Sequence, residues 1–157
     1  MHFPLFVDLS GKEILVVGAG KIASRRIRTL CDFSERITVI APEISPEVLS
    51  LAGKNSMKIL QRRFEMEDLA GKDIVLAATD DASLNREIGV RCRALGILVN
   101  VSSDQSMCDF QFPSIVQDGE VMIGLNASGK AHHLVKETRQ KVERCLNIPD
   151  GIGKYDD

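Results

Sequence analysis

Short apolar runs alternate with segments of helical spacing over residues 10–110. The first run, Ile14 to Val17, is continuous and rich in β-branched residues, which is typical of a strand buried on both faces of a parallel sheet. Residues 21–31 then place apolar side chains on one face of a predicted helix. Further strands are expected at 37–41, 57–60, 73–78 and 97–101, a short helix from Ser45 or Pro46 to Ala52, and a helix that ends at Gly96. This alternation predicts an α/β fold, a doubly wound parallel sheet built from βαβ units.

The pattern changes after residue 111. Two β-like runs, 112–116 and 121–125, flank an Asp-Gly pair, which predicts a hairpin, and a helix is expected from about Ala131 to Leu146. Its apolar stripe is predicted to hold Val135, Thr138, Val142, Cys145 and Leu146. A lone hairpin and one helix bury little, so we expect them to pack on a second copy and form a homodimer interface; the alternative is that they fold back on their own sheet. The expected division is a Rossmann-like domain at 1–111, a dimerisation segment at 112–147 and a flexible tail at 148–157.

Composition narrows the class of protein. The chain has 20 basic and 22 acidic residues, a balance that argues against nucleic acid as a partner. No apolar run approaches the length of a membrane span, and the amino terminus does not resemble a signal peptide, so we expect a cytoplasmic protein without a membrane partner. The four cysteines form no Cys-x-x-Cys pair; Cys31, Cys92 and Cys145 are interpreted as small core residues.

A dinucleotide-binding fingerprint follows the first strand. The segment Gly18 to Ala23 fits G-x-G-x-x-G/A and lies at the start of the first predicted helix. Gly18 permits the tight turn, Gly20 lets a pyrophosphate approach the backbone, and the free N–H groups at the start of the helix can hold phosphate. A purely structural glycine turn is the alternative.

Two other strand ends extend this candidate site. Glu43 follows Pro42 just after the second strand, where a carboxylate would accept hydrogen bonds from ribose hydroxyls and favour NAD over NADP. Thr79, Asp80 and Asp81 close another strand at the edge where ligands of open α/β sheets bind. A cofactor role for these residues competes with a structural one, since Asp81 can cap the following helix.

A family resemblance emerges from motifs spread along the chain. In order, they are Pro4–Leu9, Val16–Arg26, Val39–Glu43, Ala77–Asp81, Leu84–Asn85, Val99–Val101, Cys108–Phe110 and Phe112–Val116. Together they resemble the precorrin-2 dehydrogenase family of siroheme synthesis, which includes the amino-terminal module of bifunctional siroheme synthases and a fungal dehydrogenase/ferrochelatase. The resemblance implies that NAD takes a hydride from precorrin-2 to give sirohydrochlorin. It also implies that the backbone at Lys21–Ile22 and Pro42–Glu43 lines the cofactor, and that a dimer is built by the hairpin segment near Pro113.

The chain departs from the family pattern at the acid/base position. The family aspartate corresponds to Ser103, and Asp104 is next to it. Either Asp104 takes over the proton step, with help from Ser103, or that step is impaired; Asp104 can also be a simple loop residue. The family's Ser-Pro loop is replaced by Ala127–His132, and the chain ends where relatives continue into a further helical segment.

The substrate that the resemblance implies is an anionic tetrapyrrole. Residues 130–144 hold five basic against two acidic side chains, and Ser128 precedes a predicted helix N-terminus, an arrangement that suits carboxylates. Ser128, Lys130 and His132 are therefore candidate substrate-binding residues, although a solvated helix face is the simpler reading. Because His132 and His133 are adjacent, no closed metal site is predicted. The alternative functions are a sirohydrochlorin ferrochelatase, alone or bifunctional, and a non-catalytic NAD-binding partner module.

Overall fold

The computed structural model describes residues 3–128 and 131–148, apart from the side chain of His132. They form two compact units, one of Val7–Phe110 (the sheet unit) and one of the described residues in 3–6 and 111–148 (the hairpin unit). The described residues contain no helix long and apolar enough to cross a membrane.

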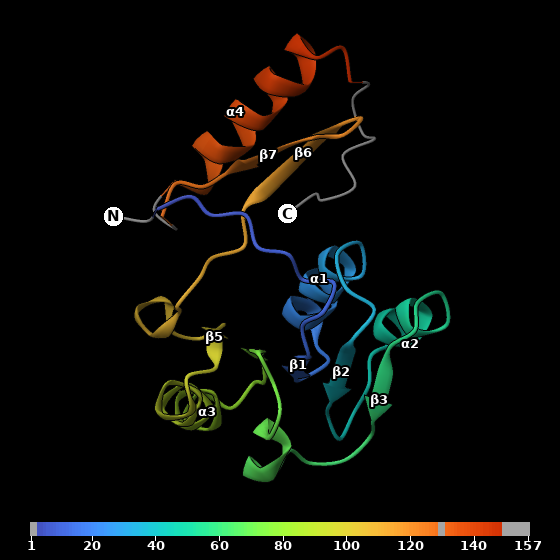
Figure 1. The fold of residues 1–157 in the computed structure, drawn as a ribbon, viewed down its shortest axis with the longest axis vertical. Coiled ribbons are helices and arrows are strands. Elements are labelled where there is room, and N and C mark those ends of the chain that lie inside the picture. Colours follow the sequence, from blue (N-terminus) through green and yellow to red (C-terminus); the bar gives the residue numbers. More distant parts are fainter. Residues whose placement is uncertain (1–2, 129–130, 149–157) are drawn as a thin grey trace. The chain divides into compact units, whose positions relative to one another are not determined.

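Five parallel strands form the centre of the sheet unit (Figure 1). They are β1 (Ile14–Val17), β2 (Ile37–Ile40), β3 (Lys58–Leu60), β4 (Ile74–Ala77) and β5 (Leu98–Val101), in the order β3-β2-β1-β4-β5. The connecting helices are α1 (Lys21–Leu30), α2 (Pro46–Ala52) and α3 (Ala82–Leu95), with short 3-10 turns η1 (Met66–Leu69) and η2 (Gln105–Met107). The predicted doubly wound parallel sheet is confirmed, and the strand ends differ from expectation by about one residue.

Both faces of this sheet are covered. Leu15 and Val17 contribute to a buried cluster that also contains Ile88 and Cys92 of α3. Val16 lies between them in the strand, so it faces the opposite side, where α1 packs on β1 and against α2. Because helices cover both faces, all four residues of β1 are buried, as the continuous apolar run predicts.

The strand register brings the functional segments together. Val17 pairs with Ile40 of β2 and Ala77 of β4, and Ala77 pairs with Val101 of β5. The carboxyl ends of β1, β2, β4 and β5 therefore meet at one edge of the sheet. In folds of this strand order, that edge is the ligand-binding edge.

The hairpin unit contains the predicted hairpin and a helix. Strands β6 (Ser114–Asp118) and β7 (Val121–Leu125) pair antiparallel, with Val116 opposite Ile123. Helix α4 (His132–Cys145) packs on both strands. Gly119 has a φ of +56°, which fits the tight turn that the Asp-Gly pair predicts.

The covered face of helix α4 is shifted from the predicted one: Val135, Val142 and Leu146 are half-buried, as the predicted stripe requires, but two of its members are not. Thr138 and Cys145, expected in the apolar stripe, are exposed in this chain, while Arg139 and Glu143 are buried. The Arg139 Nε donates to the Glu143 Oε1 at 2.8 Å, and this pairing across one helical turn lets the two charges be buried together.

The core role expected for three cysteines is correct only for Cys92. Its side chain is fully buried against the sheet, whereas Cys31 is partly exposed and Cys145 is exposed. Cys31 is the residue that follows the last turn of α1, and Cys145 is the last residue of α4. At helix ends, an apolar spacing does not ensure that a covering element continues above the side chain.

Candidate dinucleotide-binding site

The turn after β1 requires glycine at residue 18. Gly18 has a φ of +105°, and its N–H donates to the Ile40 carbonyl at 2.8 Å. A Cβ atom at this residue would lie 2.3 Å from the carbonyl oxygen of Ala78. The fingerprint glycine therefore lets β1, β2 and the end of β4 approach closely, in addition to permitting the positive φ.

The start of α1 is open to an anion. A Cβ atom on Gly20 would meet no other atom within 4 Å. Gly20 caps the helix without a side-chain hydrogen bond, and the first turn contains no acidic residue. Lys21 and Ile22 are exposed there, so the N–H groups at the helix start can face a pyrophosphate. The residues present at this turn fit the pyrophosphate of a dinucleotide.

Pro42 and Glu43 lie exposed beyond the end of β2. The Gln61 amide donates to the Pro42 carbonyl at 3.4 Å, which connects this loop to the end of β3. On the other side of the loop, the Ser24 hydroxyl of α1 lies 3.2 Å from the Ser45 hydroxyl. The Ser24 hydroxyl also contacts the Gly20 carbonyl, at 3.0 Å. The loop that carries Glu43 is thus connected to the start of α1.

The end of β4 combines a helix cap with a candidate ligand contact. Asp81 accepts hydrogen bonds from the N–H groups of Ser83 and Leu84 at 2.8 and 3.0 Å, so the capping interpretation of this residue is confirmed. Asp80 is exposed beside it. Thr79 is bound by Asn85 of α3, whose Oδ1 accepts from the Thr79 hydroxyl at 2.7 Å.

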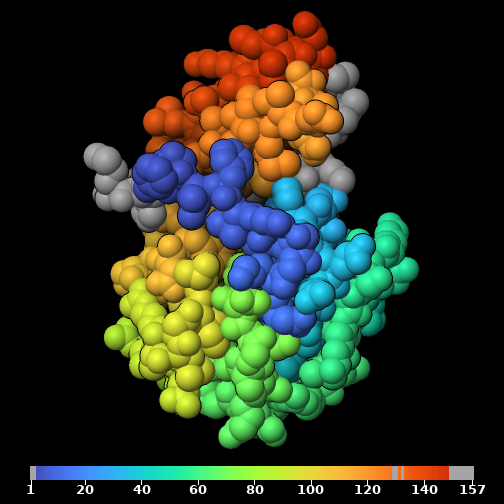
Figure 2. Space-filling view, in the orientation of Figure 1, coloured from blue at the N-terminus to red at the C-terminus, as the bar shows by residue number. Residues whose placement is uncertain are grey.

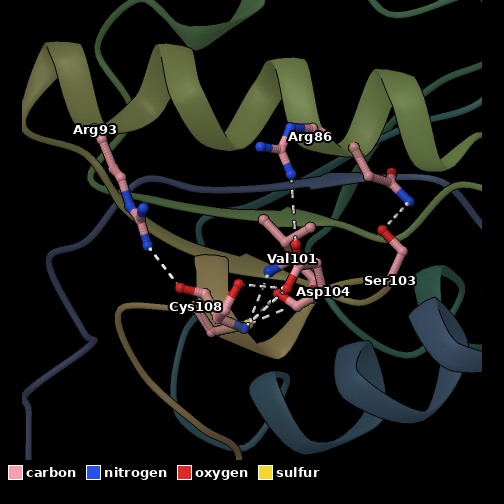
Figure 3. A network of polar contacts seen from close by, with 8 residues as sticks. Arg86, Arg93, Val101, Ser103, Asp104 and Cys108 are labelled. Atoms are coloured by element: carbon pink, nitrogen blue, oxygen red, sulfur yellow. Dashed lines mark hydrogen bonds and ion pairs between the residues drawn. The ribbon is translucent and has the colours of Figure 1, made fainter.

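Asp104 caps η2 beyond the end of β5 (Figure 3). Its Oδ1 accepts from the hydroxyl and N–H of Ser106 at 2.6 and 3.0 Å, and its Oδ2 lies 3.7 Å from an Arg86 nitrogen. The Ser106 side chain, its backbone N–H and the nearby arginines hold the pKa of Asp104 below its ordinary value. Asp104 is therefore ionised at neutral pH, but it binds a proton less readily than an ordinary aspartate.

The Cys108–Phe110 motif secures the chain after β5. The Val101 N–H donates to the Cys108 sulfur at 3.2 Å, and the thiol lies 3.3 Å from the Val101 carbonyl. Burial raises the pKa of this thiol, which favours a structural over a nucleophilic cysteine. Nearby, buried Asn100 donates to the Phe110 carbonyl at 2.8 Å and accepts a hydrogen bond from Arg26 of α1.

Asn85 was singled out in the sequence only as part of the Leu84–Asn85 motif and was not predicted as a site residue. It is completely buried, and it contacts both Thr79 and Ser103. The available signal was its place beside Leu84 on the inner face of a helix, where an unpaired amide would be costly.

The three candidate substrate residues come later in the sequence than the strand ends described above. Ser128 belongs to the hairpin unit, where its N–H donates to the Asn126 side chain at 2.8 Å and its φ is +53°. Lys130 and the side chain of His132 lie outside the described residues. Within the described part of the chain, no three His, Cys, Asp or Glu side chains are grouped closely enough to hold a metal ion.

Residues 5–114 match a family described as "Putative NAD(P)-binding". The chain is 38% identical over 152 residues to the siroheme synthase of Psychrobacter sp. (strain PRwf-1), covering 97% of this chain and 31% of that protein. It is 39% identical over 145 residues to the siroheme synthase of Pseudoalteromonas atlantica, covering 92% and 31% respectively. The chain thus spans about a third of the length of these curated relatives.

A solved structure agrees with the fold. SirC, precorrin-2 dehydrogenase, superposes with a TM-score of 0.77 and 27% sequence identity, over 92% of this chain and 71% of that one. This match confirms the Rossmann-like sheet followed by a hairpin and helix. With the family match, it supports the expected cofactor, NAD.

Proposed function

Since the chain belongs to the NAD(P)-binding family that its residues 5–114 match, we propose that it is an NAD-dependent dehydrogenase of precorrin-2. The product would be sirohydrochlorin, an intermediate of siroheme synthesis. The similarity to siroheme synthases and to a precorrin-2 dehydrogenase supports this reaction. The observation that carries the proposal is the open, uncapped start of α1 at the carboxyl edge of the sheet.

The chain's own residues have distinct tasks in this reaction. When bound, NAD supplies the acceptor for a hydride. The backbone of Gly20, Lys21 and Ile22 binds its pyrophosphate, and Glu43 accepts hydrogen bonds from the adenosine ribose. Thr79 and Asp80 line the edge at the end of β4. We assign NAD rather than NADP because the Glu43 carboxylate would repel a 2′-phosphate.

Asp104 is the proposed proton acceptor. Dehydrogenation removes two electrons and two hydrogens from the substrate, one hydrogen as hydride and the other as a proton. Because the Asp104 Oδ1 is occupied by Ser106, the proton is received at Oδ2, beside Arg86. Asp104 is ionised at neutral pH, as a base must be, although its lowered pKa makes it a weaker base than an ordinary aspartate.

An anaerobic assay with precorrin-2 tests this function. We expect sirohydrochlorin and NADH to form together, and only when NAD is supplied. Asp104→Asn should reduce turnover by about 100-fold or more without weakening NAD binding, whereas Asp118→Asn, an exposed residue of β6, should change neither. NAD binding without turnover would favour a non-catalytic module, and metal insertion without NAD would favour a chelatase.

The anionic substrate is proposed to contact the exposed basic residues of α4. Lys136, Lys141 and Arg144 are exposed, whereas Arg139 is paired with Glu143 and does not contribute to this charge. Ser128, Lys130 and His132 remain predicted substrate residues. Charge reversal at Lys136 or Lys141 should raise the KM for precorrin-2 and leave the Kd for NAD unchanged; equal KM values would exclude α4 from substrate binding.

We further propose that the chain forms a homodimer through the hairpin unit. One hairpin and one helix bury little apolar surface, and Val121 and Leu134 remain 60% and 50% exposed. Phe3 and Leu5, at 86% and 72% exposed, add apolar surface in the amino-terminal segment, which lies at the surface in Figure 2 (blue). A cytoplasmic location without nucleic-acid or membrane partners also remains a prediction.

Sedimentation analysis of paired variants tests the dimer. Val121→Asp should shift the protein toward monomer by adding a charge to the interface. Val90→Asp is the matched control, because Val90 is similarly exposed, at 58%, but lies on α3 of the sheet unit. A monomeric wild-type protein, or equal dimerisation of both variants, would contradict the proposed interface.

A further inference from the structure

Asn85 joins two strand ends at the candidate site. It is 0% exposed, although its side chain carries two polar atoms. The amide contacts Thr79 at the end of β4 and Ser103 beyond the end of β5. Because a buried amide cannot bond to water instead, its hydrogen-bond partners determine its orientation.

The contacts fix which atom of Asn85 faces which neighbour. The backbone N–H of Thr79, at 3.1 Å, can only donate, so the atom it meets must be the Asn85 oxygen. The Thr79 hydroxyl donates to the same oxygen at 2.7 Å. The Asn85 nitrogen therefore carries the two donors, and one of them is satisfied by the Thr79 carbonyl at 3.0 Å.

The second donor of Asn85 reaches the Ser103 hydroxyl oxygen at 3.4 Å (Figure 3). Because this oxygen accepts the amide hydrogen, the hydroxyl's own hydrogen is directed away from Asn85. Ser103 is exposed, so that hydrogen can be donated to a ligand at the carboxyl edge of the sheet.

The strand order indicates which part of a dinucleotide lies nearest. The pyrophosphate turn follows β1, and the ribose-binding residue Glu43 follows β2, which places the adenosine half over that side of the sheet. The other half then extends toward β4 and β5, where Thr79 and Ser103 lie. We propose that Asn85 is a positioning residue that orients Ser103 to donate a hydrogen bond to an oxygen on the nicotinamide half of the bound dinucleotide.

This inference rests on the proposed dinucleotide site, and two probes separate them. NADH carries the nicotinamide half, whereas ADP carries only the adenosine half. In Ser103→Ala, the Kd for NADH should rise about three- to ten-fold, as for the loss of one hydrogen bond, while the Kd for ADP stays unchanged. Ser103→Thr should retain NADH affinity, and Ser102→Ala is the control for a neighbouring serine.

The role of Asn85 is tested in combination with Ser103. Asn85→Asp keeps the oxygen that accepts from Thr79 but removes the donors to the Thr79 carbonyl and to Ser103, so it should weaken NADH binding at least as much as Ser103→Ala does. Adding Ser103→Ala to it should cause no further loss. If Asn85→Asp does not fold, as judged by circular dichroism, the Ser103 variants still decide the donor role.

The outcomes distinguish the two proposals. If wild-type protein binds neither ADP nor NADH in these titrations, the dinucleotide site itself is wrong. If it binds both, and Ser103→Ala weakens neither, only the Ser103 donor is overturned. If Ser103→Ala weakens ADP and NADH equally, the residue acts on the adenosine half or on the fold, and the proposal fails. Additive losses in the double variant would show that Asn85 does not act through Ser103.

Discussion

In the sheet unit, every residue of β1, β2 and β4 is buried, whereas β7 of the hairpin unit has no buried residue. The buried cluster of the sheet unit, which includes Leu15 and Val101, is mainly aliphatic. The hairpin unit buries Ile115 and Val116 of β6, but it also buries a charged pair, Arg139 and Glu143. The first unit thus has the composition of an independent core, and the second does not.

The contrast explains how the two units can serve different purposes. A sheet covered on both faces provides a rigid edge on which strand ends hold a cofactor. A hairpin with exposed Val121 and a helix with exposed Leu134 suits association, since apolar side chains left in water favour a partner.

The largest effect is expected at the tightest point of the sheet unit. Gly18→Ala forces a Cβ to within 2.3 Å of the Ala78 carbonyl at a positive φ, so it should cost about 4 kcal/mol of stability through strain and overpacking. Urea denaturation measures this loss.

Gly20→Ala is the matched control, because its Cβ meets no atom within 4 Å. Its stability should be nearly unchanged, but its NADH affinity should fall at least about tenfold. Equal stability of the two variants would contradict the close approach at Gly18.

A somewhat smaller loss is expected from the charged pair of the hairpin unit. Arg139→Ala leaves Glu143 buried without its partner and should cost about 3 kcal/mol. The double variant Arg139→Met, Glu143→Leu removes both charges and should lie within about 1 kcal/mol of the wild type. Arg86→Ala removes an exposed ion pair of the sheet unit and should cost about 0.5 kcal/mol or less. If Arg139→Ala costs no more than Arg86→Ala, solvent reaches the pair and the contrast between the units is weaker than described.

The same contrast decides what could be predicted from the sequence. The clearest prediction was β1, because burial on two faces leaves a continuous apolar run at Ile14–Val17. The strand β3 was also expected, but its pattern is weaker because none of Lys58–Leu60 is buried. On α4 the pattern predicted the helix and the half-buried Val135 and Val142 but not the burial of the charged pair. Spacing rules assign charged residues to solvent and cannot foresee that Arg139 and Glu143 satisfy each other.

The candidate site shows a similar limit. The fingerprint at Gly18 and Gly20 was recognisable because backbone geometry demands those residues. The hydrogen bond of Asn85 to Ser103 joins segments that are distant in the chain. The capping bonds of Asp104 form within a local turn. Such contacts have no periodicity that a sequence pattern could reveal.

The smallest expected effect concerns Asp104, whose charge lies at the solvent edge rather than in a core. Ser106 is the largest cause of its lowered pKa, so Ser106→Ala should return that pKa toward its ordinary value, near 4. A carboxylate whose pKa is lower in the folded state stabilises the fold above its unfolded-state pKa, and this contribution disappears as the pH falls through the folded-state pKa. Wild type should therefore be slightly more stable than Ser106→Ala at pH 7, and the difference should shrink below about pH 4.

Urea titrations of both proteins across this pH range measure the difference, and carboxyl NMR shifts of Asp104 measure its pKa directly. A gap in stability that stays constant with pH would show that Ser106 acts through packing rather than through the Asp104 charge. If the pKa rises in Ser106→Ala and NADH affinity is retained, the turnover of that variant at pH 7 then reports on Asp104 as proton acceptor. Asp104 stays ionised at pH 7 in both proteins, and a stronger base should not lose activity. A loss confined to turnover would therefore mean that the Ser106 contact is needed to hold the carboxylate in place.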